Sequence, residues 1–269
     1  MKKAILSLCL LTVSFFTAFA EEILIDGFYQ GENLYVQNPF SNDANGYCVY
    51  EVLVNEQVTT DQLESSAFEI DLAPYNFKKG DAVKVSIKHK EGCKPQILNL
   101  DALKSQSTFV ITSIAINNSG VLNWSCIEEQ GKLPYYVEQY RWGKWVNVGE
   151  VIGMGSASRH DYSFNVKEAE ISRPHSGVNK YRVRQIDYRG RSRYSLETSY
   201  NPNIPEVELT SGKKVSKEIT FSDETSYELV NSSGRVIAKG CSSVINVESL
   251  EKGKYYLNFD ADNVNITIK

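Results

Sequence analysis

The sequence is poor in the residues that most often carry catalysis and metal binding. Its only histidines are His89, His160 and His175, and none pairs with another histidine, a cysteine or an acidic residue at a spacing typical of zinc sites. The cysteines form no Cys-x-x-Cys pair. Neither a Gly-x-Ser-x-Gly elbow nor a phosphate-binding Gly-Lys-Ser/Thr loop occurs. We therefore expect no enzyme activity, no catalytic residue, no metal site and no cofactor.

Two further scarcities exclude other classes of protein. Lys and Arg number 29 against 33 Asp and Glu, and the formal net charge is −4. Proteins that bind nucleic acid usually carry a basic surplus, so we expect no nucleic-acid partner. Beyond residue 20 the sequence has no apolar run long enough to cross a bilayer, so we also expect no transmembrane segment.

The first residues have the composition of a secretory signal peptide. Lys2 and Lys3 precede a nearly unbroken apolar run at 4–16, and Ala18 and Ala20 are the small residues that favour cleavage before Glu21. The run itself is too short to span a membrane. We therefore expect an exported protein whose residues 1–20 are removed.

The cysteines that follow the signal peptide can oxidise in an exported protein. Four cysteines, Cys48, Cys93, Cys126 and Cys241, allow three full pairings, and the sequence alone does not choose among them. Cys48 and Cys93 both lie in sequence with the pattern of β-strands in the same N-terminal segment, which favours a disulfide between them. Cys126 and Cys241 lie in segments that we assign to different modules, and we interpret them as buried free thiols.

In place of helical periods, the chain has short runs of β-branched and aromatic residues broken by turn residues. These runs recur every eight to twelve residues, the spacing expected of sandwiches and barrels. The fold class expected is all-β: tandem immunoglobulin-like sandwiches followed by a small C-terminal β-sandwich. Breaks in the pattern place the modules at 21–101, 107–200 and 206–269.

The middle module, 107–200, has an early tryptophan, Trp124, and then a strand pair, "YYVEQY" and "WVNVGEV". The strand "YRVRQID" follows, with a glycine turn and "RYS". This order resembles a fibronectin type III domain. The resemblance implies a sandwich in which Tyr181, Val183 and Gln185 face the core, and it implies nothing about function.

Two loops of this module are candidates for ligand contact. In "YRWGKW", Trp142 and Lys144 lie at a hairpin tip, where exposed rings and cations can bind sugars or peptides. The alternative is that the rings of this segment fill the sandwich core. In "YRGRSRY", Arg189 and Arg191 form a basic loop that either is solvated or contacts an anionic glycan. A glycan or a protein is the expected ligand.

The C-terminal module contains two sequence phrases, "YELVNSSGRVIAKG" and "VINVESLEKGKYYLNF", each with the strand–turn–strand pattern expected of a β-hairpin. Together they resemble the C-terminal sorting domain, type A, of proteins carried by the type IX secretion system of Bacteroidetes. The resemblance implies that the secretion machinery is a partner and that the protein is a secreted or cell-surface protein. The motif residues are Gly234, Arg235, Leu250, Gly253 and Tyr255.

The interpretation favoured is a non-enzymatic binding or structural cargo protein of that system. One alternative is a resident periplasmic or outer-membrane accessory of secretion or adhesion machinery, which would keep its C-terminal module. The other is a hydrolase whose site includes His160 and Asp161.

Overall fold

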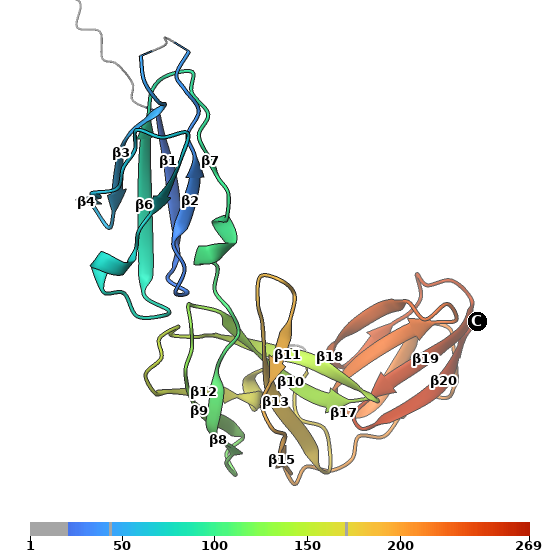
Figure 1. The fold of residues 1–269 in the computed structure, drawn as a ribbon. Helices are drawn as coiled ribbons and strands as arrows, with labels where there is room; N and C mark the ends of the chain where they lie inside the picture. Colours follow the sequence, from blue (N-terminus) through green and yellow to red (C-terminus); the bar gives the residue numbers. More distant parts are fainter. Residues whose placement is uncertain (1–20, 43–44, 170–171) are drawn as a thin grey trace, which may run out of the picture. The chain divides into compact units, whose positions relative to one another are not determined.

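The structure is a computed structural model that describes residues 21–42, 45–169 and 172–269. The predicted signal peptide, 1–20, lies outside the described residues. The described residues form strands β1–β20 and three short 3-10 helices, and none of them lies in an α-helix (Figure 1). The prediction of an all-β protein is confirmed. The 3-10 helices are η1 (Ala73–Tyr75), η2 (Leu100–Leu103) and η3 (Val166–Glu168).

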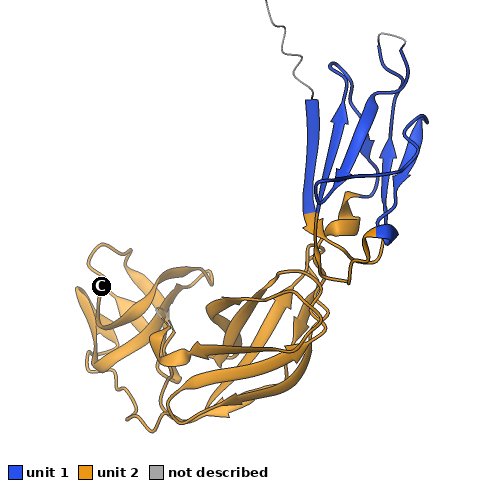
Figure 2. Cartoon of the chain, turned by 90° about the vertical axis from the view of Figure 1, so that its left-hand side faces the viewer, with its two compact units in different colours: residues 1–26, 33–74, 84–99 blue, residues 27–32, 75–83, 100–269 orange. Residues whose placement is uncertain are grey.

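The chain divides into two compact units (Figure 2). The first contains residues 1–26, 33–74 and 84–99, and the second contains 27–32, 75–83 and 100–269. The second unit therefore holds both segments that we expected as the middle and C-terminal modules. Each of these two segments has its own sheets and its own hydrophobic cluster.

The first unit contains an immunoglobulin-like pair of sheets. Residues alternate between buried and exposed along β6, with Val85 and Ile87 fully buried, as in strands that cover a core with one face. The predicted disulfide is confirmed, with 5.7 Å between the Cα atoms of Cys48 and Cys93. One sheet has the order β1 (Glu21–Phe28), β6 (Ala82–His89), β3 (Val49–Val54), β4 (Gln57–Val58); the other is β5 (Ala67–Ile70), β2 (Leu34–Gln37), β7 (Gln96–Ile97).

The middle module is a sandwich of the fibronectin type III kind. Its hydrophobic cluster contains Trp124, Tyr181 and Val183, so the predicted core positions are confirmed. Gln185 is also buried, and its amide donates to the carbonyl of Leu133. The sheets are β12 (His160–Asn165), β9 (Val121–Ile127), β8 (Val110–Ile116), and β11 (Lys144–Ile152), β10 (Pro134–Arg141), β13 (Asn179–Ile186), β14 (Ser192–Tyr194), with β15 (Thr198–Tyr200) also paired to β13.

The C-terminal module is built on one bent hairpin. The register of β17 shifts between Thr220 and Thr225, so its later part pairs with both β18 and β19 while Thr220 bonds to Thr210 in the preceding segment. Residues on both sides of the shift, Ile219 and Phe221 before or within it and Leu229 after it, belong to the hydrophobic cluster of this module. The sheet order is β16 (Lys214–Val215), β20 (Asp262–Ile268), β19 (Gly253–Phe259), β17 (Glu218–Asn231), β18 (Val236–Asn246).

None of the helices in the described part of the chain has the length and hydropathy that a membrane-spanning helix needs.

Candidate functional site

The tip of the β10–β11 hairpin is a tight two-residue turn. Arg141 pairs with Lys144 across it, and Trp142 and Gly143 have φ angles of 52° and 77°. Turns with two left-handed residues match the twist of the flanking strands. A tryptophan in this backbone region is uncommon, because side chains with a Cβ disfavour positive φ. The indole makes contacts that offset this cost: its N–H donates to the carbonyl of Asp260, and its ring lies beside the guanidinium of Arg141.

Arg141 is the buried centre of this tip. The residue is 2% exposed, and its Nε donates to the carbonyl of Asp260 at 3.0 Å. Its Nη1 donates to Ser172 Oγ at 3.2 Å and to the carbonyl of Arg173 at 2.9 Å. Burial lowers the pKa of Arg141 to about 10, so it stays charged at neutral pH. A buried cation is tolerated only when hydrogen bonds replace its lost hydration, and these bonds do so.

Asp260 receives donors from several segments of the second unit. It lies at the β19–β20 turn with a φ of 43°, and its carbonyl also accepts the indole N–H of Trp142 at 3.1 Å. Its carboxylate accepts the backbone N–H of Ser176 at 2.9 Å and the Ser176 hydroxyl. The Asp260 N–H donates to Thr225 Oγ1. Asp260 is therefore a buried hydrogen-bonded hub that joins the middle and C-terminal modules.

Ion pairs and one backbone bond flank this hub. Lys144 Nζ lies 2.6 Å from Glu228 Oε2 on β17, and Arg173 Nη1 lies 3.3 Å from Glu224. The N–H of Arg173 donates to Ser226 Oγ at 3.0 Å. We call the contacts of Arg141, Trp142, Lys144, Arg173 and Ser176 with the C-terminal module the junction.

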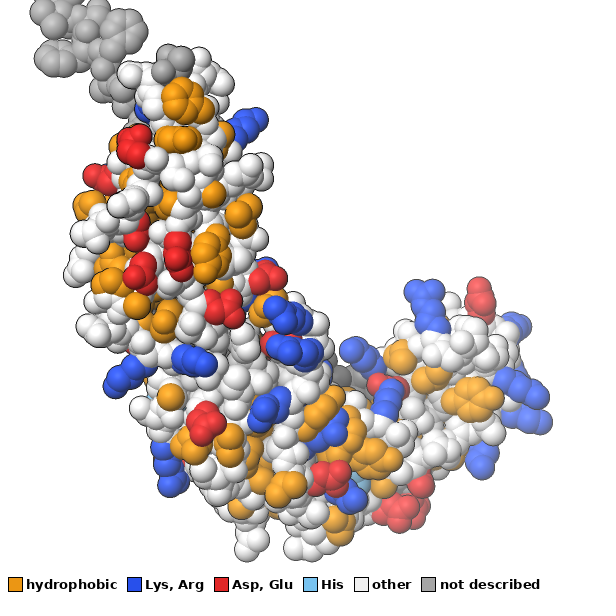
Figure 3. All heavy atoms as spheres, viewed as in Figure 1, with side chains coloured by type: hydrophobic (Ala, Val, Ile, Leu, Met, Phe, Trp, Pro, Cys, Tyr) orange, Lys and Arg blue, Asp and Glu red, His pale blue; other side chains and the backbone are white. Residues whose placement is uncertain are grey.

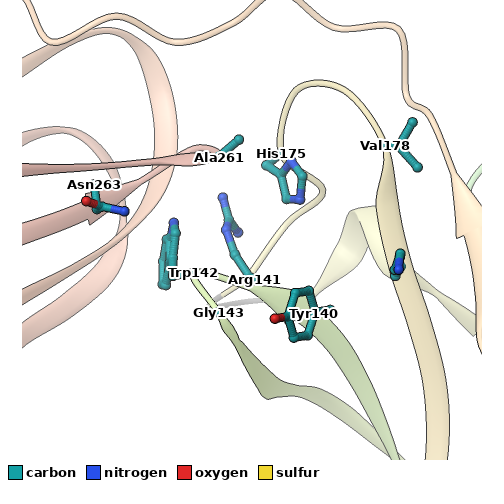
Figure 4. A pocket seen from close by; sticks show the side chains of 9 residues that line it. Tyr140, Arg141, Trp142, Gly143, His175, Val178, Ala261 and Asn263 are labelled. Carbon is teal, nitrogen blue, oxygen red and sulfur yellow. The ribbon is translucent and has the colours of Figure 1, made fainter.

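A cavity of about 330 Å³ opens beside the junction (Figure 4). Figure 4 shows Arg141 between Trp142 and His175, and the guanidinium carbon lies 4.6 Å from the centre of the Trp142 ring. Burial lowers the pKa of His175, which keeps the imidazole neutral at pH 7. The cavity is lined by Tyr140, Arg141, Trp142, Gly143, His175, Val178, Lys180, Ala261 and Asn263, with no acidic side chain among them.

A second feature lies on the outer face of the sheet that contains β10 and β13. Along β13, Tyr181 and Val183 face the core, so Lys180, Arg182 and Arg184 share the opposite face. The guanidinium of Arg182 lies 4.0 Å from the centre of the Trp145 ring and 4.2 Å from that of Tyr194. These distances are within the range of favourable cation–π contacts.

Glu138 fixes the two arginines of this face. It is buried, and its carboxylate accepts Arg182 Nε at 2.8 Å and Arg184 Nε at 2.6 Å. Arg184 also lies over the ring of Tyr136, at 5.3 Å from its centre. Within the described part of the chain, the Nη groups of Arg182 and Arg184 make no hydrogen bond, so they remain available as donors. We call Tyr136, Tyr140, Trp145, Lys180, Arg182, Arg184 and Tyr194 the arginine–aromatic face.

Other exposed side chains give a weaker signal. Figure 3 shows one surface of the molecule, where hydrophobic side chains are scattered in small groups among charged and polar ones. Scattered apolar residues are normal on protein surfaces and indicate nothing by themselves. The ordered contacts of the arginine–aromatic face are more informative than exposure alone.

The four residues named as ligand contacts from the sequence divide between two places. Trp142 and Lys144 contact Asp260 and Glu228 at the junction. Arg191 donates to the carboxylate of Asp187, and Arg189 lies over the ring of its neighbour Tyr188. The rings of Tyr140, Trp142 and Trp145 lie outside the hydrophobic cluster of the middle module.

Sequence reasoning missed Arg182, Arg184, Glu138 and the burial of Arg141. The signal for the two arginines was present in "KYRVRQI", where basic residues alternate with the three expected core positions. That period of two predicts a row of cations on the outer face.

The sorting-motif residues occupy turns and core positions of the C-terminal module. The first phrase forms the β17–β18 hairpin as expected, but the prediction of a second hairpin is wrong, because β18 and β19 both pair with β17 and lie on opposite sides of it. Gly234 has a φ of 80° in the β17–β18 turn, and Gly253 begins β19. Arg235 is exposed and Leu250 is half-buried against the hydrophobic cluster. Tyr255 is buried and donates to the carbonyl of Glu251 at 2.8 Å.

The residues of the hydrolase alternative lie on β12. His160 Nε2 contacts Ser156 Oγ at 2.7 Å, while Asp161 accepts hydrogen bonds from Ser125 and Arg159. Neighbouring residues of a strand point to opposite faces, so Asp161 does not orient the imidazole of His160. Among the described residues, no group of three or more potential metal ligands is found.

No protein-family model and no curated protein matches this chain. Among solved structures, the fibronectin(III)-like modules of Clostridium thermocellum CbhA are 15% identical with a TM-score of 0.22, and the match covers 60% of this chain and 94% of that one. A Salmonella alpha-2-macroglobulin is 10% identical with a TM-score of 0.26, covering 93% and 22%. Latent dimeric PorU from Porphyromonas gingivalis is 11% identical with a TM-score of 0.23, covering 93% and 30%. This chain spans less than a third of the last two, and likenesses this weak carry no argument about function.

Proposed function

We propose that this chain is an exported, non-enzymatic protein that binds an acidic polysaccharide through the arginine–aromatic face and is routed through the type IX secretion system by its C-terminal module. Immunoglobulin-like sandwiches are common in cell-surface proteins, and the Cys48–Cys93 disulfide suits an oxidising compartment. The observation that carries the binding role is Arg182, whose guanidinium lies between two rings and is anchored through Nε to Glu138.

The chemistry of this face favours a polymer that carries both carboxylates and sugar rings. Alternate residues of a strand lie about 7 Å apart, so Lys180, Arg182 and Arg184 form a straight row of cations. Guanidinium groups bind carboxylates through paired N–H donors. Tyr140 and Tyr194 are 42% and 49% exposed beside this row and offer flat surfaces for sugar rings. An acidic peptide would satisfy the cations but would not need the rings.

The binding role is tested by titrating the full chain with polygalacturonate, and with neutral dextran as the comparison. We expect polygalacturonate to bind, binding to weaken as salt rises, and Arg182→Gln to weaken it about 10-fold, the loss typical of a charge-assisted hydrogen bond. Arg159→Gln, directly before β12 of the opposite sheet, is the matched control and should leave the affinity for polygalacturonate unchanged. Equal binding by Arg182→Gln, or stronger binding of polyglutamate than of polygalacturonate, would reject the polysaccharide.

The routing role is supported by the resemblance of two sequence phrases of the C-terminal module to the sorting domain, of which the first forms the β17–β18 hairpin with Gly234 in its turn. Deleting 206–269 in a Bacteroidetes host with an active type IX system should leave the protein in the periplasm. The intact mass of the wild-type protein separates the alternatives. A form ending near residue 200 outside the cell indicates cleaved cargo, whereas a form that keeps Lys269 in the periplasm or outer membrane indicates a resident accessory.

A further inference from the structure

The C-terminal module is attached to the middle module in two ways, by the covalent linker and by the noncovalent contacts of the junction. Tyr200 belongs to the hydrophobic cluster of the middle module and Val207 to that of the C-terminal module. Between them, 201–206 are largely exposed, with Ile204 at 44%. Among the described residues, this segment's single hydrogen bond joins Asn203 to Asn201 inside the segment itself. The linker therefore connects the modules without holding them in place.

The junction carries contacts that do not depend on the linker. Donors from Arg141, Trp142 and Ser176 converge on the Asp260 turn, 84 to 119 positions away along the chain. Two ion pairs add to these contacts. Lys144 and Arg173 of the middle module pair with Glu228 and Glu224, which both lie on β17. Contacts from central buried groups with charged pairs around them resemble the arrangement of a stable interface between separate proteins.

We propose that the middle module binds the C-terminal module as a ligand, and that the two stay bound after the linker at 201–206 is cut. The hairpin tip recognises the carbonyl of Asp260 through Arg141 and Trp142, and Ser176 in the loop before β13 recognises its carboxylate. One part of this inference rests on the proposed function: cleavage of the linker in the cell is expected because processing of a sorting domain would cut it there. A cut would then leave a nicked complex, and removal of the C-terminal module would need a competitor for the Asp260 turn.

The position of Trp142 provides a clean test variant. Its φ of 52° suits glycine, so Trp142→Gly keeps the turn of the hairpin while removing the indole that donates to Asp260. Glu56→Gly is the matched control, because Glu56 has a φ of 68° and is exposed in the first unit. Both variants add a glycine at a left-handed position, and only one lies at the junction.

The experiment places a specific protease site at 202–205 of the full chain, cuts it, and follows the two fragments by size-exclusion chromatography on dilution. We expect the nicked wild-type and Glu56→Gly proteins to elute as one species. We expect Trp142→Gly to release the C-terminal fragment at least about 10-fold faster, the effect of losing a partly buried hydrogen bond together with packing area.

Separation of the nicked wild-type fragments at micromolar concentration would overturn the proposal. Equal release from Trp142→Gly and Glu56→Gly would also overturn it, because the junction would then not be the binding surface. A second measurement guards against misfolding: far-ultraviolet circular dichroism, which reports the backbone and not the deleted indole, should give the same strand content for each uncut variant as for the wild type. These outcomes are independent of routing, since the purified protein can stay docked when export does not use the type IX system.

Discussion

Arg141 and Asp260 lie 119 positions apart in the chain, and the guanidinium Nε of Arg141 donates a 3.0 Å hydrogen bond to the carbonyl of Asp260. The same guanidinium bonds to Ser172 and Arg173 in the loop before β13. One buried side chain therefore ties a hairpin tip, a loop of its own module and a turn of the next module together.

Replacing Arg141 with methionine should destabilise the protein by about 3 kcal/mol. Methionine fills much of the volume but leaves the carbonyl of Arg173 and the hydroxyl of Ser172 without their buried donor, and such losses cost about 1–3 kcal/mol each. Urea unfolding monitored by tryptophan fluorescence measures the change. Arg189→Met, at an exposed position of the same module, should change the free energy of unfolding by less than about 0.5 kcal/mol. Equal stability of the two variants would contradict the structural role of Arg141.

Acidification should weaken the second unit through His175. Burial lowers the pKa of this imidazole below its ordinary value of 6.5, and the nearby charge of Arg141 lowers it further. The unfolded chain then binds the proton more readily, so the contribution is complete above the unfolded pKa and is lost as the pH falls below it. Unfolding measured between pH 7.5 and 5 should show a decline that is smaller in His175→Gln. An unchanged pH profile in that variant would assign the decline to other groups.

Much of the fold follows from residues close in sequence. The alternation in "KYRVRQI" predicts the burial of Tyr181 and Val183, because a strand with one face on a core must alternate. The Cys48–Cys93 pair was predictable because both cysteines lie in one β segment. Local pattern was sufficient for the core positions because the burial of a strand face is set within the strand itself.

The junction could not be predicted in this way. Trp142 is at a hairpin tip, where local rules favour exposure, and its partner is a backbone carbonyl that any residue could supply. From the sequence, Arg141 is expected at the surface, because arginine is rarely buried without partners. Its partners in the structure, Ser172, Arg173 and Asp260, are distant in the sequence. Contacts between modules leave little trace in a single sequence because they depend on tertiary placement rather than on period.

The two free thiols should react slowly in the folded protein. Cys126 is buried, and burial raises its pKa to about 11, which leaves almost no thiolate at pH 8. Burial also raises the pKa of Cys241, and its hydrogen bond with Glu224 adds to the effect. In the protein without residues 1–20, which contain Cys9, a chromogenic disulfide reagent should titrate two thiols in denaturant and modify the native protein much more slowly. Rapid native labelling of Cys126 would contradict its placement in the core.

Neutralising Glu138 should both destabilise the middle module and disturb the arginine–aromatic face. Glu138→Gln keeps the shape but replaces two charge-assisted hydrogen bonds to Arg182 and Arg184 with weaker ones, a loss of about 2 kcal/mol. The variant should also bind polygalacturonate differently, because the arginines lose the anchor that orients them. Glu150→Gln, an exposed change on the neighbouring β11, is the control. If both glutamines behave alike in unfolding, Glu138 does not anchor the face.

Removing the disulfide should lower the stability of the first unit by about 4 kcal/mol. The bond closes a loop with a sequence separation of 45, and the chain-entropy account of such a loop gives this magnitude. Both cysteines are buried, so Cys48→Ala with Cys93→Ala avoids leaving a buried hydroxyl without a partner. The double variant should match the reduced wild-type protein in denaturant unfolding, because both lack the same cross-link. A double variant as stable as the oxidised protein would mean that the unfolded chain gains no freedom when the bond is lost, and the loop would then have to keep residual structure after unfolding.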